Sequence, residues 1–192
     1  MYVATSSPQP ARWRVAVDTP RELHRALFFR DALRLPTLPG AGHLTIPAPE
    51  RSTEGSDRLA LAWSHWWSSL LAHLRGGPVA LAAHAGAPGL DVDPELDRLL
   101  ADGEGEFKRW WTGAGRDQRG HKLELAHAAR KATRAEADLL ASRGQQVLLA
   151  VDVISLDGPF RHAVSRDHVV VSTAARAQAD YPEWLARTVF PT

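Results

Sequence analysis

Residues 56–75 constrain the fold of this chain more than any other segment, because their spacing predicts an amphipathic helix. At about 100° per residue, six large apolar side chains fall within one third of the helix circumference. They are Leu59, Trp63, Trp66, Trp67, Leu70 and Leu74. Ser56 can cap the first free amides, and Gly76-Gly77-Pro78 ends the helix. Since one tryptophan can bury about 150–250 Å², we expect this helix at the centre of the core.

Length and composition indicate one compact domain. The chain has 192 residues, of which 44% are hydrophobic and 23% are charged, and these values argue against global disorder. We expect residues 12–192 to form the domain and the Pro- and Ser-rich residues 1–11 to be a flexible N-terminus. The absence of cysteine excludes disulfides, thiolate metal sites and a cysteine nucleophile.

Charge and hydropathy argue against nucleic acid and membranes as partners. The net charge of +1 gives no electrostatic reason to expect nucleic acid or a membrane surface. The first residues contain no apolar signal-peptide region, and no window approaches the ~18 apolar residues of a membrane-spanning helix. We therefore expect a soluble, cytoplasmic protein.

Helical and extended patterns alternate irregularly over the first three quarters of the chain. Period-two alternation predicts a strand at 13–17, and a helix follows over about 20–34. A Pro/Gly-rich loop at 35–55 is expected to be exposed, with a short edge strand over 43–46. A short apolar strand is predicted at 79–83. Helices are predicted at about 94–101, 106–111 and 120–142, with the flexible glycine stretch 113–120 before the last.

The last quarter is richer in strands. Residues 146–155 are apolar on both faces, which predicts a central strand in a covered sheet. Asp157-Gly158 is typical of a turn, residues 168–173 predict another strand, and a final helix opens at Asp180. This order of elements predicts an α+β fold, with a small mixed or antiparallel sheet packed against several helices in a single compact domain.

The glycine-rich stretch from Gly113 to Lys122 invites comparison with a phosphate-binding loop. Lys122 is displaced by one residue from the required spacing, no Ser or Thr follows it, and a helix rather than a strand precedes the stretch. We interpret it as a linker. The nine histidines include no HExxH motif and no pair four residues apart, so we expect no metal and no cofactor.

Asp152 is the most suggestive candidate for catalysis, because an ionised carboxylate is costly to bury unpaired within an apolar strand. His162 or His168 could pair with it for acid–base chemistry, or both could join it as metal ligands. If Asp157-Gly158 closes a two-residue hairpin, the two histidines share one face and Asp152 lies on the other. A shift of one residue in register would reverse that arrangement.

The doubled tryptophans suggest a binding surface. Adjacent helical residues point about 100° apart, so both rings of a pair cannot fill one narrow seam. Trp67 lies at the edge of the central stripe, and Trp110 and Trp111 lie on a short helix beside the glycine stretch. Either the fold wraps these rings, or they contact a protein partner, a second copy of the chain or an apolar ligand.

The leading functional hypothesis is a soluble, non-catalytic binding or assembly protein with a Trp-rich surface at Trp67, Trp110 and Trp111. The alternative is a small hydrolase or metal-dependent enzyme that uses Asp152 with His162 or His168. No motif resembles that of a particular family.

Overall fold

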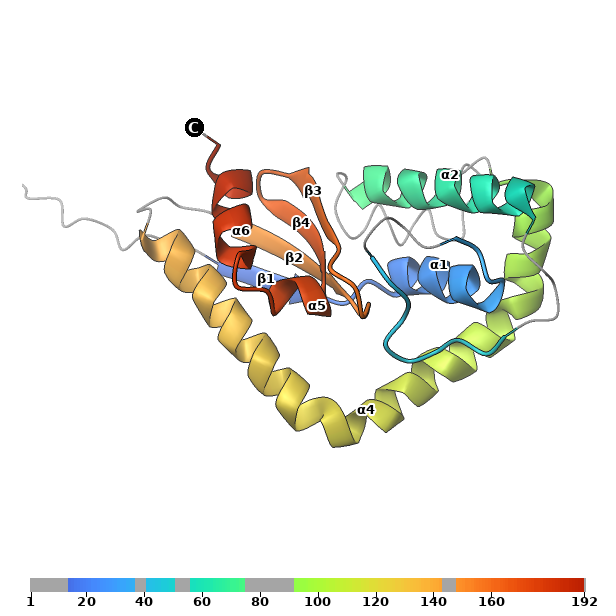
Figure 1. Cartoon of the computed structure of the whole chain (residues 1–192), viewed down its shortest axis with the longest axis horizontal. Coiled ribbons are helices and arrows are strands. Elements are labelled where there is room, and N and C mark those ends of the chain that lie inside the picture. Colours follow the sequence, from blue (N-terminus) through green and yellow to red (C-terminus); the bar gives the residue numbers. More distant parts are fainter. Residues whose placement is uncertain (1–13, 37–40, 51–55, 75–91, 143–147, 192) are drawn as a thin grey trace, which may run out of the picture.

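The computed structural model describes residues 14–36, 41–50, 56–74, 92–142 and 148–191, with the backbone alone at 14, over 114–130 and at 140. Its elements, in chain order, are β1 (Arg14–Asp18), α1 (Arg21–Ala32), α2 (Asp57–His73), α4 (Pro94–Ser142), β2 (Leu148–Ile154), β3 (Arg161–Ser165), β4 (His168–Ser172), α5 (Thr173–Arg176) and α6 (Tyr181–Val189). The fold is α+β, as the sequence predicts, and the helices predominate (Figure 1).

The four strands form one mixed sheet in the order β1-β2-β4-β3. β1, β2 and β4 are parallel, and β3 is antiparallel to β4. The predicted central position of the strand within 146–155 is confirmed, since β2 lies between β1 and β4. A parallel sheet needs cover on both faces, and two apolar clusters provide it.

The larger cluster contains α1, α2 and the first part of α4, packed against one face of the sheet. The predicted tryptophan helix is confirmed: the Ser56 hydroxyl accepts a hydrogen bond from the Leu59 amide, and all six side chains of the stripe are buried. Trp63 is only 2% exposed, and its indole N–H donates to the Ala26 carbonyl of α1 over 2.8 Å. Ile154 and Val170 join this cluster from the sheet.

The smaller cluster covers the opposite face of the sheet. Leu149, Val151, Val169 and Val171 project from β2 and β4 toward α6, where Tyr181, Leu185 and Val189 meet them. Leu139 of α4 packs at its margin. The sheet therefore lies between a helical layer on one side and α6 with the end of α4 on the other.

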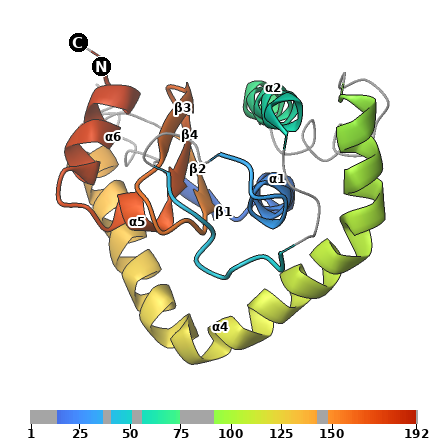
Figure 2. The ribbon, with the colours of Figure 1, turned by 45° about the vertical axis from the view of Figure 1, so that its right-hand side comes forward.

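α4 joins the two layers and corrects the sequence analysis. The three helices predicted over 94–101, 106–111 and 120–142 are one continuous helix, so the interpretation of 113–120 as a flexible linker is wrong. Figure 2 shows that α4 bends into two arms, the first beside α1 and α2 and the second beside the sheet and α6. Each interior glycine costs only about 1 kcal/mol relative to alanine, and packing of both arms outweighs that cost.

The connection after β2 also differs from the prediction. Asp157-Gly158 does not close a hairpin between β2 and β3, because β4 lies between those strands. The hairpin joins β3 to β4 instead, with a register shift between Ala163 and Ser165. Since β4 is the hydrogen-bonded neighbour of β2, the residues that face Asp152 differ from those expected.

The segment within 35–55 is less exposed than expected. Leu35, Ala41 and Leu44 are buried in the larger cluster, so the assignment of this segment to an exposed loop is wrong at these positions. Leu44 makes a single β-bridge with Leu156 in place of the edge strand expected over 43–46. Residues 37–40 and 51–55, the strand predicted at 79–83 and the N-terminal residues 1–11 lie outside the described part of the chain.

Candidate functional site

Asp152 and His168 form a buried pair on the sheet. The His168 Nε2 atom lies 2.8 Å from Oδ2 of Asp152, and both side chains are about one-tenth exposed. Because a carboxylate can only accept, the His168 Nε2 carries the shared proton. The expectation that Asp152 faces away from His168 is wrong, since the parallel register places Ala150 opposite His168 and Asp152 opposite Val170. The two side chains thus satisfy each other's hydrogen-bonding groups, on the face of the sheet that packs against the larger cluster.

His162 does not join this pair. It lies on β3, separated from Asp152 by β4, and its ring stacks on Phe160 with ring centroids 6.4 Å apart. Within the described ranges, no group of three or more His, Asp or Glu side chains is placed to hold a metal ion. The three candidate catalytic residues therefore reduce to one contacting pair, Asp152 with His168.

The candidate binding tryptophans pack largely against their own chain. Trp67 is 3% exposed and stacks on Trp63 at 5.7 Å. Of the two alternatives for its ring, the fold therefore wraps it, and its assignment to an exposed Trp-rich surface is wrong. Trp110 and Trp111 are half-buried, with Trp110 at 5.3 Å from Phe28 and Trp111 at 5.1 Å from His24. These aromatic contacts join α4 to α1.

His24 is a structural histidine at this junction. Its Nδ1 donates to the Pro20 carbonyl over 2.9 Å, and its Nε2 accepts the Ser155 amide over 3.1 Å. That pair of bonds requires the neutral ring. Burial lowers the pKa of His24, although its bond to the Pro20 carbonyl acts in the opposite direction. The ring links α1 to the end of β2 and is unavailable for chemistry.

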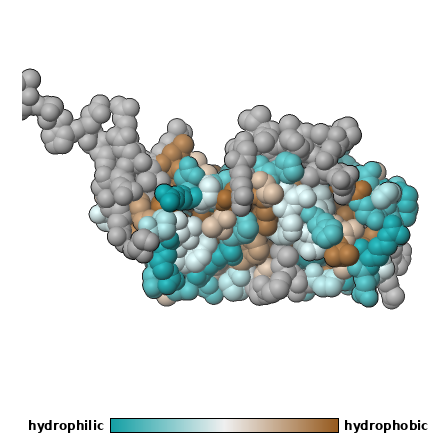
Figure 3. Space-filling model, turned by 90° about the horizontal axis from the view of Figure 1, so that it is seen from above, coloured by the Kyte–Doolittle hydropathy of each residue, from teal (hydrophilic) through white to brown (hydrophobic). Residues whose placement is uncertain are grey.

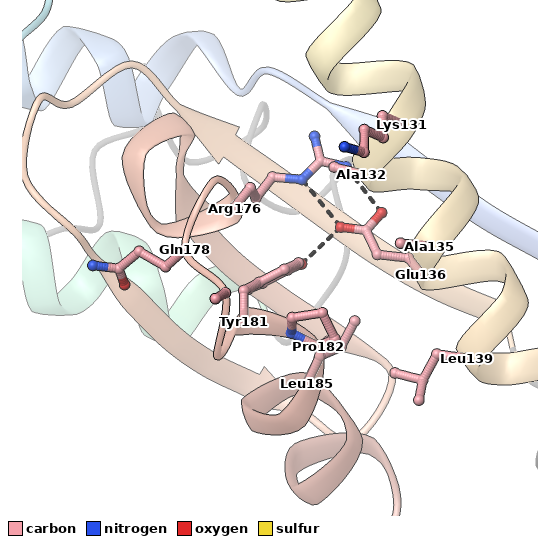
Figure 4. A pocket seen from close by; sticks show the side chains of 11 residues that line it. Lys131, Ala132, Ala135, Glu136, Leu139, Arg176, Gln178, Tyr181, Pro182 and Leu185 are labelled. Atoms are coloured by element: carbon pink, nitrogen blue, oxygen red, sulfur yellow. Dashed lines mark hydrogen bonds and ion pairs between the residues drawn. The ribbon is translucent and has the colours of Figure 1, made fainter.

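A pocket of about 260 Å³ lies between the second arm of α4 and the segment from α5 to α6 (Figure 4). Its polar residues are Lys131, Glu136, Arg176, Gln178 and Tyr181. Its apolar wall is formed by Ala132, Ala135, Leu139, Ala179, Pro182 and Leu185. The pocket thus has the usual composition of a small-molecule site, an apolar wall with a few converging polar groups.

Glu136 organises the polar part of the pocket. Its Oε1 accepts hydrogen bonds from Arg176 Nε at 3.0 Å and from the Tyr181 hydroxyl at 2.7 Å, while Oε2 accepts from Arg176 Nη2 at 2.9 Å. Arg176 Nη2 also donates to the Thr133 hydroxyl over 3.2 Å. The side chains of Glu136 and Arg176 are only 1% and 6% exposed. The charges of this buried ion pair are therefore matched and fixed in place.

Local structure around α5 positions Arg176. The Ser172 hydroxyl at the end of β4 accepts the Ala175 amide over 3.0 Å and donates to the Gly158 carbonyl over 2.8 Å, which caps α5. Arg161 of β3 forms an ion pair with Asp180, just before α6. These bonds anchor both ends of the segment that carries Arg176 to the sheet.

Tyr181 is held in its protonated form. Burial raises the pKa of the phenol, and the negative charge of Glu136 raises it further. A phenol of this kind donates a hydrogen bond but does not act as a base near neutral pH. The geometry therefore favours recognition over proton transfer in the pocket.

Glu136, Arg176 and Tyr181 were not predicted from the sequence, because 40 or more residues separate Glu136 from the other two. One signal was present. Glu136 lies four residues after Ala132 and three before Leu139, on the helical seam that these small and apolar residues form. A charged residue on such a seam indicates a buried partner.

Comparisons with protein-family models, with curated proteins and with solved structures give no match. No helix in the described ranges is both long enough and apolar enough to cross a membrane.

Proposed function

We propose that this chain is a non-catalytic binding protein whose ligand site is the pocket between α4 and α6. The observation that supports this proposal is the joining of an apolar wall to the fixed polar cluster of Glu136, Arg176 and Tyr181. A preformed site of this kind loses little entropy when a ligand binds.

The same cluster argues against catalysis in the pocket. The carboxylate oxygens of Glu136 already accept bonds from Arg176 and Tyr181, and the phenol of Tyr181 keeps its proton. A general acid or base must release or take a proton near the operating pH. These three groups are instead arranged to hold one another in place.

A neutral apolar fluorophore, N-phenyl-1-naphthylamine, tests this proposal. We expect saturable binding of one fluorophore per chain, and we expect Ala132→Trp to abolish it by filling the pocket. Ala141→Trp is the matched control, because Ala141 is exposed on the same helix and outside the pocket. Equal binding by both variants, or no saturable binding by the parent chain, would exclude the pocket as the site.

The alternative function is a small hydrolase, and the hydrogen bond between Asp152 and His168 is the observation that favours it. A carboxylate that orients an imidazole is part of many acid–base sites. This function predicts hydrolysis of p-nitrophenyl acetate that Asp152→Asn abolishes and His162→Gln leaves unchanged. Equal rates for the parent chain and Asp152→Asn would remove the hydrolase hypothesis.

Assembly through Trp110 and Trp111 is a second form of the binding hypothesis. Both rings are half-buried, so each leaves part of its surface uncovered by its own chain. On the face in Figure 3, the coloured hydrophobic residues form small groups among hydrophilic ones. Light scattering of the parent chain and of the double Trp110→Ser, Trp111→Ser variant tests this form. If the parent chain is already monomeric, self-association is excluded.

A further inference from the structure

We propose that the pocket between α4 and α6 selects a small amphipathic carboxylate, such as a medium-chain fatty acid. This inference rests on the proposed function and adds the chemical class of the ligand. The pocket volume of about 260 Å³ is just below the usual range for drug-sized ligands. A short, flexible chain with one charged end fits that size.

Two cations lie at one end of the pocket. Figure 4 shows the Lys131 amine and the guanidinium of Arg176 on the same side of the pocket, with Lys131 reaching toward Arg176 from α4. Lys131 is exposed and forms no ion pair with any residue that the structure describes. Arg176 uses Nε and Nη2 for Glu136 and Thr133, and its Nη1 has no partner among those same residues. A carboxylate can accept bonds from both cations.

Glu136 does not reverse this preference for an anion. It is the single acidic residue of the lining, and it already accepts bonds from Arg176 and Tyr181. With Lys131 and Arg176 opposite one carboxylate, the lining has a net charge of +1. A cationic ligand would have to displace Arg176 from Glu136 and leave a buried guanidinium unpaired, which is costly.

The remainder of the pocket suits a hydrocarbon chain. Ala132, Ala135 and Leu139 line it from α4, and Pro182 and Leu185 line it from α6. The two alanines have short side chains, and Leu139, Pro182 and Leu185 supply the larger apolar surfaces of the lining. Binding of a hydrocarbon chain there is favoured by each methylene that it removes from water. The carboxylate would then determine the orientation of the ligand.

Calorimetric titration with octanoate and with octanamide tests the charge preference. The two probes have the same chain, but the amide is neutral. We expect octanoate to bind at least about tenfold more tightly, because hydrogen bonds to charged groups stabilise by about 1.5 kcal/mol or more, and about 1.4 kcal/mol corresponds to a factor of ten. We expect Lys131→Gln to weaken octanoate binding about twofold to fivefold, the range of an exposed ion pair, and to leave octanamide binding unchanged.

Arg134→Gln is the matched control for Lys131→Gln. Arg134 is exposed on the same helix and lies outside the pocket lining, so its removal changes the net charge equally without touching the site. Equal binding of octanoate and octanamide, or equal effects of the two variants, would overturn the carboxylate preference and leave the proposed function intact. Failure of both probes and of the neutral fluorophore to bind would overturn the proposed function as well.

Discussion

Replacement of Trp63 should test the core more severely than any other single substitution on α2. The side chain is 2% exposed, stacks on Trp67 at 5.7 Å, and donates a buried hydrogen bond to the Ala26 carbonyl. Emptying such a site costs about 3–5 kcal/mol for Trp→Ala. Domains of this kind have a total stability of about 5–15 kcal/mol, so Trp63→Ala should remove a large share of it.

Trp63→Phe separates the contribution of the aromatic ring from that of the indole N–H donor. Phenylalanine keeps an aromatic ring beside Trp67 but loses the N–H donor, whose net contribution is about 1 kcal/mol. We therefore expect Trp63→Phe to have a free energy of unfolding between those of the parent chain and Trp63→Ala. Ser64→Ala is the surface control, since Ser64 is exposed on the same helix, and it should stay within about 0.5 kcal/mol of the parent chain.

Guanidinium denaturation followed by far-ultraviolet circular dichroism measures these differences without relying on tryptophan fluorescence, which the substitutions alter. The slope of the transition should stay constant while the midpoint falls in the order Ser64→Ala, Trp63→Phe, Trp63→Ala. A midpoint for Trp63→Ala equal to that of Ser64→Ala would refute the assignment of α2 to the core.

Three further outcomes follow from the structure. Gly113→Ala should stabilise the chain by about 0.5–1 kcal/mol by thermal denaturation, because Gly113 is helical and open space surrounds the added carbon; no gain would argue against a continuous α4. Gly42→Ala should destabilise it by more than about 1 kcal/mol in the same assay, because φ is +66° and the new carbon would lie 1.9 Å from an Asp157 oxygen. Burial lowers the pKa of His24 below its ordinary 6.5, so on acidification the unfolded chain binds the proton before the folded chain does. The stability that the neutral ring contributes is therefore complete above about pH 6.5 and should fall as the pH drops below that value. His24→Gln should flatten this dependence in urea titrations between pH 7 and 5, and an unchanged slope would contradict the structural role of the ring.

Elements with strong periodic patterns could be predicted from the sequence. The tryptophan stripe predicted α2 because its spacing fits one helical face, and the burial of Trp63 follows from that spacing. The cap follows from the hydroxyl of Ser56 just before the stripe. The two-sided apolar run around Val151 predicted the central position of β2. In both cases local sequence and tertiary packing favour the same structure.

Predictions failed where tertiary packing overrides a local signal. Gly113 and Gly120 are typical helix breakers, yet α4 continues through them because its two arms are packed at separate places. Asp157-Gly158 is typical of a hairpin, but β4 pairs with β2 and brings His168 to Asp152. Strand order is set by pairings that no local pattern contains.

The pocket could not be predicted for a related reason. Glu136 meets Arg176 and Tyr181 only after α4 spans both layers and α6 returns to the sheet. Each of these residues alone has an ordinary local context. Their combination depends on the path of α4 as one continuous helix, whereas its glycines had indicated a linker between separate helices.

The most direct test of the central claim, that the pocket between α4 and α6 is the ligand site, is an isotope-filtered NOE experiment. The isotopically labelled chain would be saturated with unlabelled octanoate, and contacts from the octanoate methyl group would be assigned. We predict contacts with the methyl groups of Leu139 and Leu185, which line the pocket. Contacts with the exposed Leu61 of α2 and none with Leu139 or Leu185 would place the ligand outside the pocket and contradict this claim.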